Sequence, residues 1–94
     1  MMQKIYKFVL KVMFNRIMRN GNSVIVTVPS LVYESGYTKL WFWRRTNEYT
    51  GETYIAMADL GCGRYPIDGF RNKEEWNKFV ERSYIEKVKI FQGV

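Results

Sequence analysis

The sequence predicts a small α+β domain in which a β-hairpin core is flanked by an N-terminal and a C-terminal helix. Residues 23–28 place valines on one side of a strand and Ser23, Ile25 and Thr27 on the other. Two runs of β-forming residues within 40–58 flank a glycine-containing loop, and a helix-capping pattern begins at Asn72. A length of 94 residues predicts a single domain with a limited core.

Residues 1–14 are predicted to form an amphipathic helix, because apolar and basic side chains separate on a helical wheel. The apolar face comprises Ile5, Phe8, Val9, Val12 and Met13, and the basic face comprises Lys4, Lys7 and Lys11. Such a helix either packs on its own domain or lies on an anionic membrane surface. We favour packing and expect no membrane partner, since the lysines also interrupt any membrane span or signal peptide.

The segment from Arg19 to Pro29 predicts a tight turn followed by a strand. Asn20-Gly21 suits a type I′ hairpin turn, because both residues tolerate positive φ. One side of the strand then carries Val24, Val26 and Val28, and the other carries Ser23, Ile25 and Thr27. Pro29 ends the strand because it lacks a backbone donor.

A second hairpin is predicted from Leu40 to Ala58, with its loop at residues 47–51. Leu40 and Phe42 alternate with Trp41 and Trp43, so both faces of the first strand carry large apolar groups. We therefore expect both faces to be covered, one of them by a partner subunit. The hairpins together define a core over residues 15–58.

Residues 59–71 contain several glycines and Pro66, and they predict a connector. Asn72 and Glu75 have the spacing of a capping box, which starts a C-terminal helix over residues 72–91. Apolar residues at helical spacing, Trp76, Phe79, Val80 and Tyr84, are expected to pack on the sheet. Residues 84–91 fit either a continued helix or a short strand.

Positive charge is concentrated in the first half of the chain. Residues 1–45 hold eight basic side chains and one acidic side chain, which gives +7, whereas residues 46–94 hold seven and eight, which gives −1. An uneven positive charge of this kind is typical of a protein that contacts nucleic acid phosphates. Lysines that serve only solubility would give the same total.

The composition offers little for catalysis. The chain has no histidine and one cysteine, Cys62, so neither a Cys-His nucleophile nor a typical zinc cluster can form. No pair of carboxylates has a spacing that suggests a shared site. We therefore expect no enzyme, no metal, no cofactor and no small-molecule substrate. A single cysteine also requires no oxidising compartment, which favours the cytoplasm.

A basic residue, one spacer, Gly-Asn-Ser, a short β run and a proline resemble the start of the AbrB/MazE-type swapped-hairpin domain. The resemblance covers residues 16–58. After the proline the family runs through a short helix, whereas residues 30–36 leave room for only a brief connection here. The resemblance implies a swapped-hairpin core and a homodimer that binds DNA.

These observations predict a sequence-dependent double-stranded DNA-binding transcriptional regulator. The resemblance places Arg19 on bases or phosphate, with Arg16 nearby, and removal of Arg19 is expected to weaken binding more than removal of Lys87. The full set of expected DNA-binding residues is Arg16, Arg19, Asn20, Asn22, Ser23, Lys39, Arg44 and Arg45.

Two other functions fit the same sequence. The aromatic hairpin suits a protein-interaction or inhibitor module. It also suits a binder of single-stranded nucleic acid, in which Trp41, Trp43 and Tyr54 stack on bases while Arg44 and Arg45 contact phosphates. We favour core or dimer packing as the role of these aromatic side chains.

Overall fold

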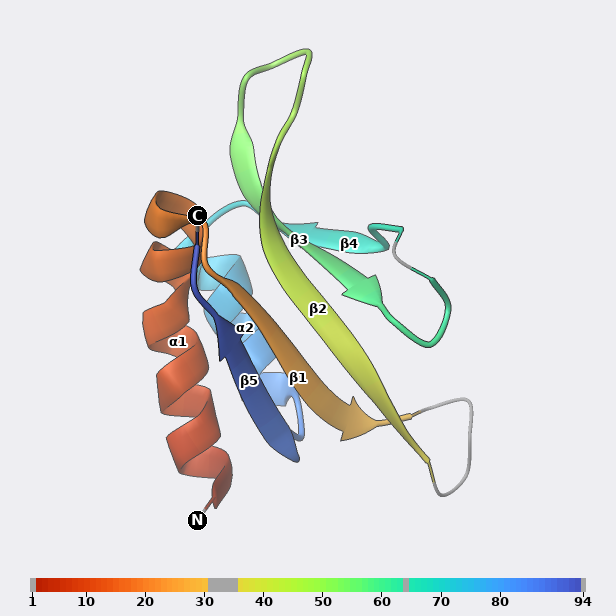
Figure 1. The fold of residues 1–94 in the computed structure, drawn as a ribbon. Coiled ribbons are helices and arrows are strands. Elements are labelled where there is room, and N and C mark those ends of the chain that lie inside the picture. The colour runs from red at the N-terminus through yellow and green to blue at the C-terminus, as the bar shows by residue number, and fades with distance from the viewer. Residues whose placement is uncertain (1, 31–35, 64, 94) are drawn as a thin grey trace.

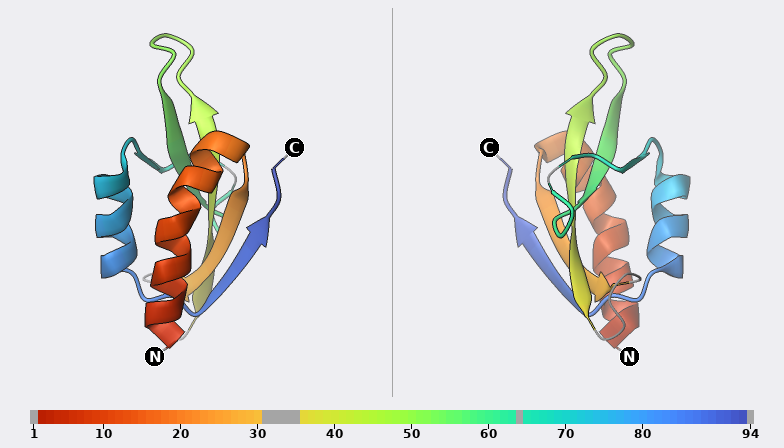
Figure 2. Two further views of the ribbon diagram at one scale, coloured as in Figure 1. Left: turned by 90° about the vertical axis from the view of Figure 1, so that its left-hand side faces the viewer. Right: turned by 90° about the vertical axis from the view of Figure 1, so that its right-hand side faces the viewer.

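The computed structural model describes residues 2–30, 36–63 and 65–93, and within them the chain forms two helices and a five-stranded antiparallel sheet. Both helices lie on the same face of the sheet (Figures 1 and 2). The predicted α+β class is confirmed. The elements are α1 (Met2–Asn20), β1 (Ser23–Pro29), β2 (Tyr37–Thr46), β3 (Thr53–Asp59), β4 (Asp68–Phe70), α2 (Lys73–Arg82) and β5 (Lys87–Phe91), and the strand order is β4-β3-β2-β1-β5.

Strand β1 has the alternation that the sequence predicts. Val24 and Val26 are buried beneath the helices, whereas Ser23 and Ile25 are only half-buried on the other face. Pro29 is the last residue of the strand, as expected. Because β1 lies between β2 and β5, its valines occupy the middle of the core.

The predicted hairpin turn at Asn20-Gly21 is wrong. α1 continues to Asn20, well past the predicted boundary at residue 14, and Gly21 follows it with φ at 74°. A type I′ turn needs positive φ at two residues, but no described residue other than glycine has one. Gly21 instead ends the helix, and the chain reverses from helix to strand. Within the predicted connection over residues 30–36, residues 31–35 lie outside the part of the chain that the structure describes.

The packed face of α1 also differs from the prediction. Its buried residues are Leu10, Met13, Phe14 and Ile17. Of the five residues expected to face the core, only Met13 is buried, and Phe8 is 68% exposed. The buried face is rotated towards Leu10, Phe14 and Ile17, and Ile17 lies beyond the end of the predicted helix at residue 14.

The second predicted hairpin is confirmed as β2 and β3. Phe42 pairs with Met57, and Trp43 pairs with Ala56. The backbone N–H of Asn47 donates to the Glu52 carbonyl at 2.8 Å and closes the loop. This hairpin projects beyond the rest of the sheet (Figure 1).

The C-terminal region is half helix and half strand. The N–H of Glu75 donates to Asn72 Oδ1 at 2.9 Å, which confirms the predicted start of α2. The helix ends at Arg82, and residues 87–91 form β5 along the free side of β1. The predicted connector over 59–71 contains the short strand β4. Tyr84, expected in the core, is 58% exposed because the helix has already ended.

Trp76 of α2 joins the two helices to the sheet. Its side chain is fully buried, and its indole Nε1–H donates to the carbonyl of Leu10 in α1 at 2.7 Å. The ring meets Phe42 edge-on at 5.0 Å between centroids and Phe70 at 5.4 Å. One side chain therefore contacts α1, β2 and β4.

Replacement of Trp76 by alanine should lower the free energy of unfolding by about 3–5 kcal/mol, because it leaves a large cavity. Urea denaturation would measure the loss. Tyr84→Ala, which removes an exposed aromatic ring, should change stability by less than about 0.5 kcal/mol. Equal effects of the two substitutions would contradict the central position of Trp76.

An ion pair links the outer surfaces of the helices. Lys11 of α1 pairs with Glu81 of α2, and Lys7 Nζ donates to the Glu81 carbonyl at 2.8 Å. The hydrogen bond and charge of Lys11 lower the pKa of the Glu81 carboxyl. Since the folded pKa lies below the unfolded one, the pair stabilises the fold above the ordinary carboxyl pKa. That contribution is lost as the pH falls through the lowered pKa.

Lys11→Met should therefore raise the pKa of Glu81 towards its ordinary value. A titration of the side-chain carboxyl carbon by NMR would report the change. Lys4→Met removes an exposed lysine from the same helix and serves as the control. A Glu81 pKa that is unchanged by Lys11→Met would rule out the ion pair in solution.

Candidate nucleic-acid interface

The face of the sheet opposite the helices is covered by neither described helix (Figure 2). Directly paired residues of an antiparallel sheet point to the same side, so the strand register assigns each side chain to a face. We call this side the open face. The side chains on it are Ser23, Ile25, Thr27 and Pro29 of β1, Tyr37, Lys39, Trp41, Trp43 and Arg45 of β2, Tyr54, Ala56 and Ala58 of β3, and Lys87, Lys89 and Phe91 of β5.

Two stacked tryptophans lie in the middle of the open face. The ring centroids of Trp41 and Trp43 are 4.2 Å apart, with 20° between the ring planes. Both side chains are half-buried, and they pair across to the fully buried Ala58 and Ala56. Both alanines are fully buried although they belong to the open face, so the sheet is covered at these two positions.

Tyr54 extends the aromatic surface towards β4. It pairs with Arg45, and its ring lies against Gly69. A Cβ atom at Gly69 would be 3.0 Å from Tyr54 Cδ2, which is tighter than most Cβ contacts. Glycine at this position therefore lets the tyrosine ring lie over the edge of the sheet.

Four exposed cations surround these rings: Lys39, Arg45, Lys87 and Lys89. Lys39 and Lys87 both pair with Thr27 from opposite sides, which puts their strands about 10 Å apart. Among the described strand residues, no Asp or Glu points to this face, and none of the four cations has a carboxylate partner in the described chain. Within the described strands the open face therefore carries aromatic rings and cations, and Glu48 of the β2–β3 loop lines a pocket with Arg45 and Tyr54.

The expected DNA-binding residues divide between the two sides of the sheet. Ser23, Lys39 and Arg45 lie on the open face. Arg44 points to the helix side, where its Nη1 donates to the carbonyls of Met18 and Arg19 at 3.3 Å each. Arg44 thus binds the C-terminal end of α1, where a cation complements the helix dipole.

The other four expected residues belong to α1 or follow it. Arg16, Arg19 and Asn20 are exposed on α1. Asn22 is buried, and its Oδ1 accepts a hydrogen bond from the Gly93 N–H at 2.8 Å, so it has a structural role. The structure therefore does not bring the eight expected residues together on one surface.

Sequence reasoning missed Lys87, Lys89 and Phe91 as members of the same surface. Their alternation is a strand signal, but residues 84–91 also fit a helix. The pairing of β5 with β1 joins residues at least sixty positions apart, and no short pattern encodes it. Only the assembled sheet places these residues on the same face as Trp41, with β1 between the two strands.

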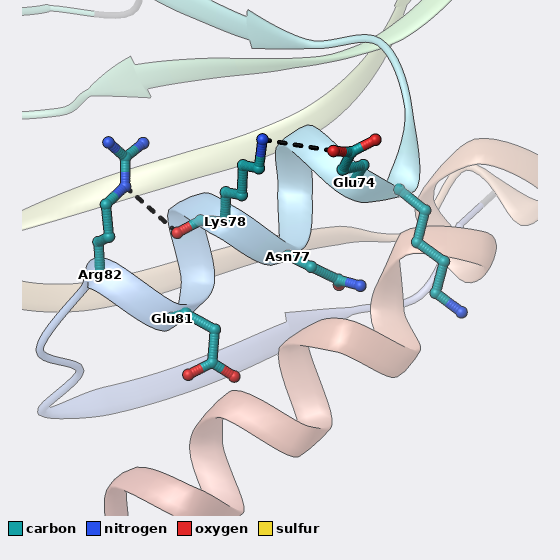
Figure 3. Close-up of a pocket in the computed structure, with 6 residues that line it drawn as sticks. Glu74, Asn77, Lys78, Glu81 and Arg82 are labelled. Carbon is teal, nitrogen blue, oxygen red and sulfur yellow. Dashed lines mark hydrogen bonds and ion pairs between the residues drawn. The ribbon is translucent and has the colours of Figure 1, made fainter.

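A pocket with a volume of about 670 Å³ lies elsewhere, along α2 (Figure 3). Its described lining belongs to that helix alone: Lys73, Glu74, Asn77, Lys78, Glu81 and Arg82. Glu74 pairs with Lys78 at 3.3 Å, and Glu81 pairs with Lys11 of α1. Both carboxylates are thus engaged by lysines, and we place no site here. The described residues also contain no group of His, Cys, Asp or Glu suited to a metal ion.

Comparison with known protein families, characterised proteins and solved structures gave no match to this chain. The resemblance to AbrB/MazE-type domains therefore stays a prediction, as do the dimer and the cytoplasmic location. Among the described helices, neither is long and apolar enough to cross a membrane.

Arg44 and Arg45 are neighbours in sequence but point to opposite faces. Arg44→Gln should lower the free energy of unfolding by about 0.3–1 kcal/mol, because it removes the cation at the end of α1. Arg45→Gln should leave stability nearly unchanged. Urea denaturation of both variants would measure the difference, and the reverse order of stabilities would contradict the assignment of faces.

Proposed function

We propose that this protein binds single-stranded nucleic acid on the open face of its sheet. The observation that carries the proposal is the stacked pair Trp41 and Trp43, half-exposed on a surface with four cations and, within the described strands, no carboxylate. This is one of the alternatives that the sequence left open. Arg45 stays among the residues expected to contact phosphates, whereas lysines of β2 and β5 take the role that was expected of Arg44.

Unpaired bases expose π-faces that stack on aromatic side chains, and each such contact is worth about 1–3 kcal/mol in other proteins. The indoles of Trp41 and Trp43 and the ring of Tyr54 supply such surfaces along β2 and β3. Stacking on these rings tolerates every base, so the proposal implies weak sequence preference.

The cations suit the phosphate backbone of the same strand. Lys39, Lys87 and Lys89 lie towards one end of the open face, and Arg45 lies beyond Trp43 towards the other. A strand stacked on the tryptophans would therefore have a cation at either end. Such contacts release counterions, so the affinity should fall as salt rises.

The shape of the sheet favours single strands over duplex DNA. Five strands span roughly 19 Å, whereas the major groove of B-DNA is about 12 Å wide. The projecting tip of the β2–β3 hairpin is narrow enough to enter the major groove. Residues 47–52 at this tip, however, include Glu48 and Glu52 and no cation that could contact phosphates. Duplex DNA stays the second candidate because Arg16 and Arg19 are exposed on a helix that has no acidic residue.

The proposal is tested by fluorescence-anisotropy titration of single-stranded DNA, single-stranded RNA and duplex DNA at several salt concentrations. Single-stranded DNA and single-stranded RNA should each bind more tightly than duplex DNA of the same length. Tighter binding to duplex DNA than to single strands, lost in the variant Arg16→Gln/Arg19→Gln, would favour a duplex-binding transcriptional regulator. Absence of binding to all three would favour the protein-interaction module.

Matched variants locate the interface. Arg45→Gln and Lys87→Gln should each weaken single-strand binding and reduce the magnitude of the salt slope by about 0.7. Trp41→Ala should cost about 1–3 kcal/mol of binding free energy. Arg44→Gln and Lys73→Gln are the controls, because both positions lie away from the open face. Equal losses for Arg45→Gln and Arg44→Gln would exclude this interface, since only Arg45 lies on it.

A further inference from the structure

A row of apolar side chains on α1 points away from the sheet. Met2 and Ile5 are each 58% exposed, Phe8 is 68% exposed, and Val12 is 46% exposed. We call these four residues the α1 stripe. On the helical wheel Phe8 lies opposite the buried residues Leu10 and Ile17, so the stripe forms an outward ridge along the helix.

The surroundings of the α1 stripe are positively charged. Lys4, Arg16 and Arg19 are exposed along the same helix, and no Asp or Glu occurs between Met2 and Asn20. Lys7 and Lys11 lie towards α2, where the backbone and carboxylate of Glu81 engage them. The stripe is therefore an apolar ridge in a cationic field.

We propose that the α1 stripe docks on an anionic lipid surface, with the helix lying in the plane of the interface. Exposed apolar side chains of such a helix enter the boundary between headgroups and acyl chains, while flanking lysines and arginines attract lipid phosphates. The sequence led us to expect that residues such as Phe8 and Val12 would pack on their own domain. The structure instead leaves them exposed, with the charges that an anionic surface complements.

The same charges argue against a second copy as the occupant. Two α1 helices packed through their stripes would bring lysines and arginines together with no acidic residue on either helix to pair with them. The ridge is also only one helix wide and convex. A stable protein interface generally needs about 800 Å² on each partner, whereas a fluid lipid interface adapts to a narrow ridge.

The α1 stripe and the open face lie on opposite sides of the sheet, so lipid docking does not depend on nucleic-acid binding (Figure 2). Ile90 of the edge strand β5 is 45% exposed and lines a shallow groove with Phe8 and Val12. It extends the apolar surface beside the helix.

Co-sedimentation with vesicles tests the proposal, using phosphatidylglycerol mixed with phosphatidylcholine and, in parallel, phosphatidylcholine alone. The protein should bind only the anionic vesicles. Phe8→Ser/Val12→Ser should weaken that binding at least about tenfold, because two apolar side chains no longer enter the interface. Lys4→Gln/Arg16→Gln should weaken it and reduce its dependence on salt.

Two control variants remove the same kinds of side chain elsewhere: Tyr49→Ser in the β2–β3 loop, and Lys73→Gln/Arg82→Gln on α2. Both should bind vesicles as the unmodified protein does, and so should Arg45→Gln of the open face. Circular dichroism would confirm that each variant is folded.

Three results would overturn the proposal. The first is no binding to anionic vesicles. The second is binding that Phe8→Ser/Val12→Ser leaves unchanged, which would show attraction by charge alone. The third is self-association, measured by sedimentation velocity, that Phe8→Ser/Val12→Ser abolishes, together with no binding to vesicles. That result would assign the α1 stripe to contact with a second copy of the chain.

Discussion

The burial of Trp76 is the interaction on which the rest of the structure depends. Its indole packs against Phe42 and Phe70 of the sheet and donates a hydrogen bond to the carbonyl of Leu10 in α1. These contacts hold both helices against one face of the sheet, because a single side chain satisfies partners in three elements. Neither described helix covers the other face (Figure 2).

That division explains why the three tryptophans have different environments. Trp76 is fully buried, whereas Trp41 and Trp43 stack on each other and stay half-exposed on the open face. A contiguous aromatic patch that is not fully buried marks a candidate binding surface. The cations on the same face support our proposal that a single strand of nucleic acid binds there, and the apolar ridge of α1 supplies a second surface on the opposite side.

Local patterns predicted much of the fold, but they did not predict where distant segments meet. The alternation in β1, the β2–β3 hairpin and the Asn72 cap depend on neighbouring residues, and all three are confirmed. Asn20-Gly21 was misassigned because the same dipeptide can end a helix or form a hairpin turn. The open face could not be assembled from the sequence, since Lys87 and Lys89 join it only through the pairing of β5 with β1.

The most direct test of the open face is an NMR titration of the three indole N–H signals with a single-stranded oligothymidylate. Our account predicts progressive shifts of the Trp41 and Trp43 signals, while Trp76, bonded to Leu10 beneath the sheet, stays unchanged. Shifts confined to the backbone signals of α1, with Trp41 and Trp43 unaffected, would contradict it.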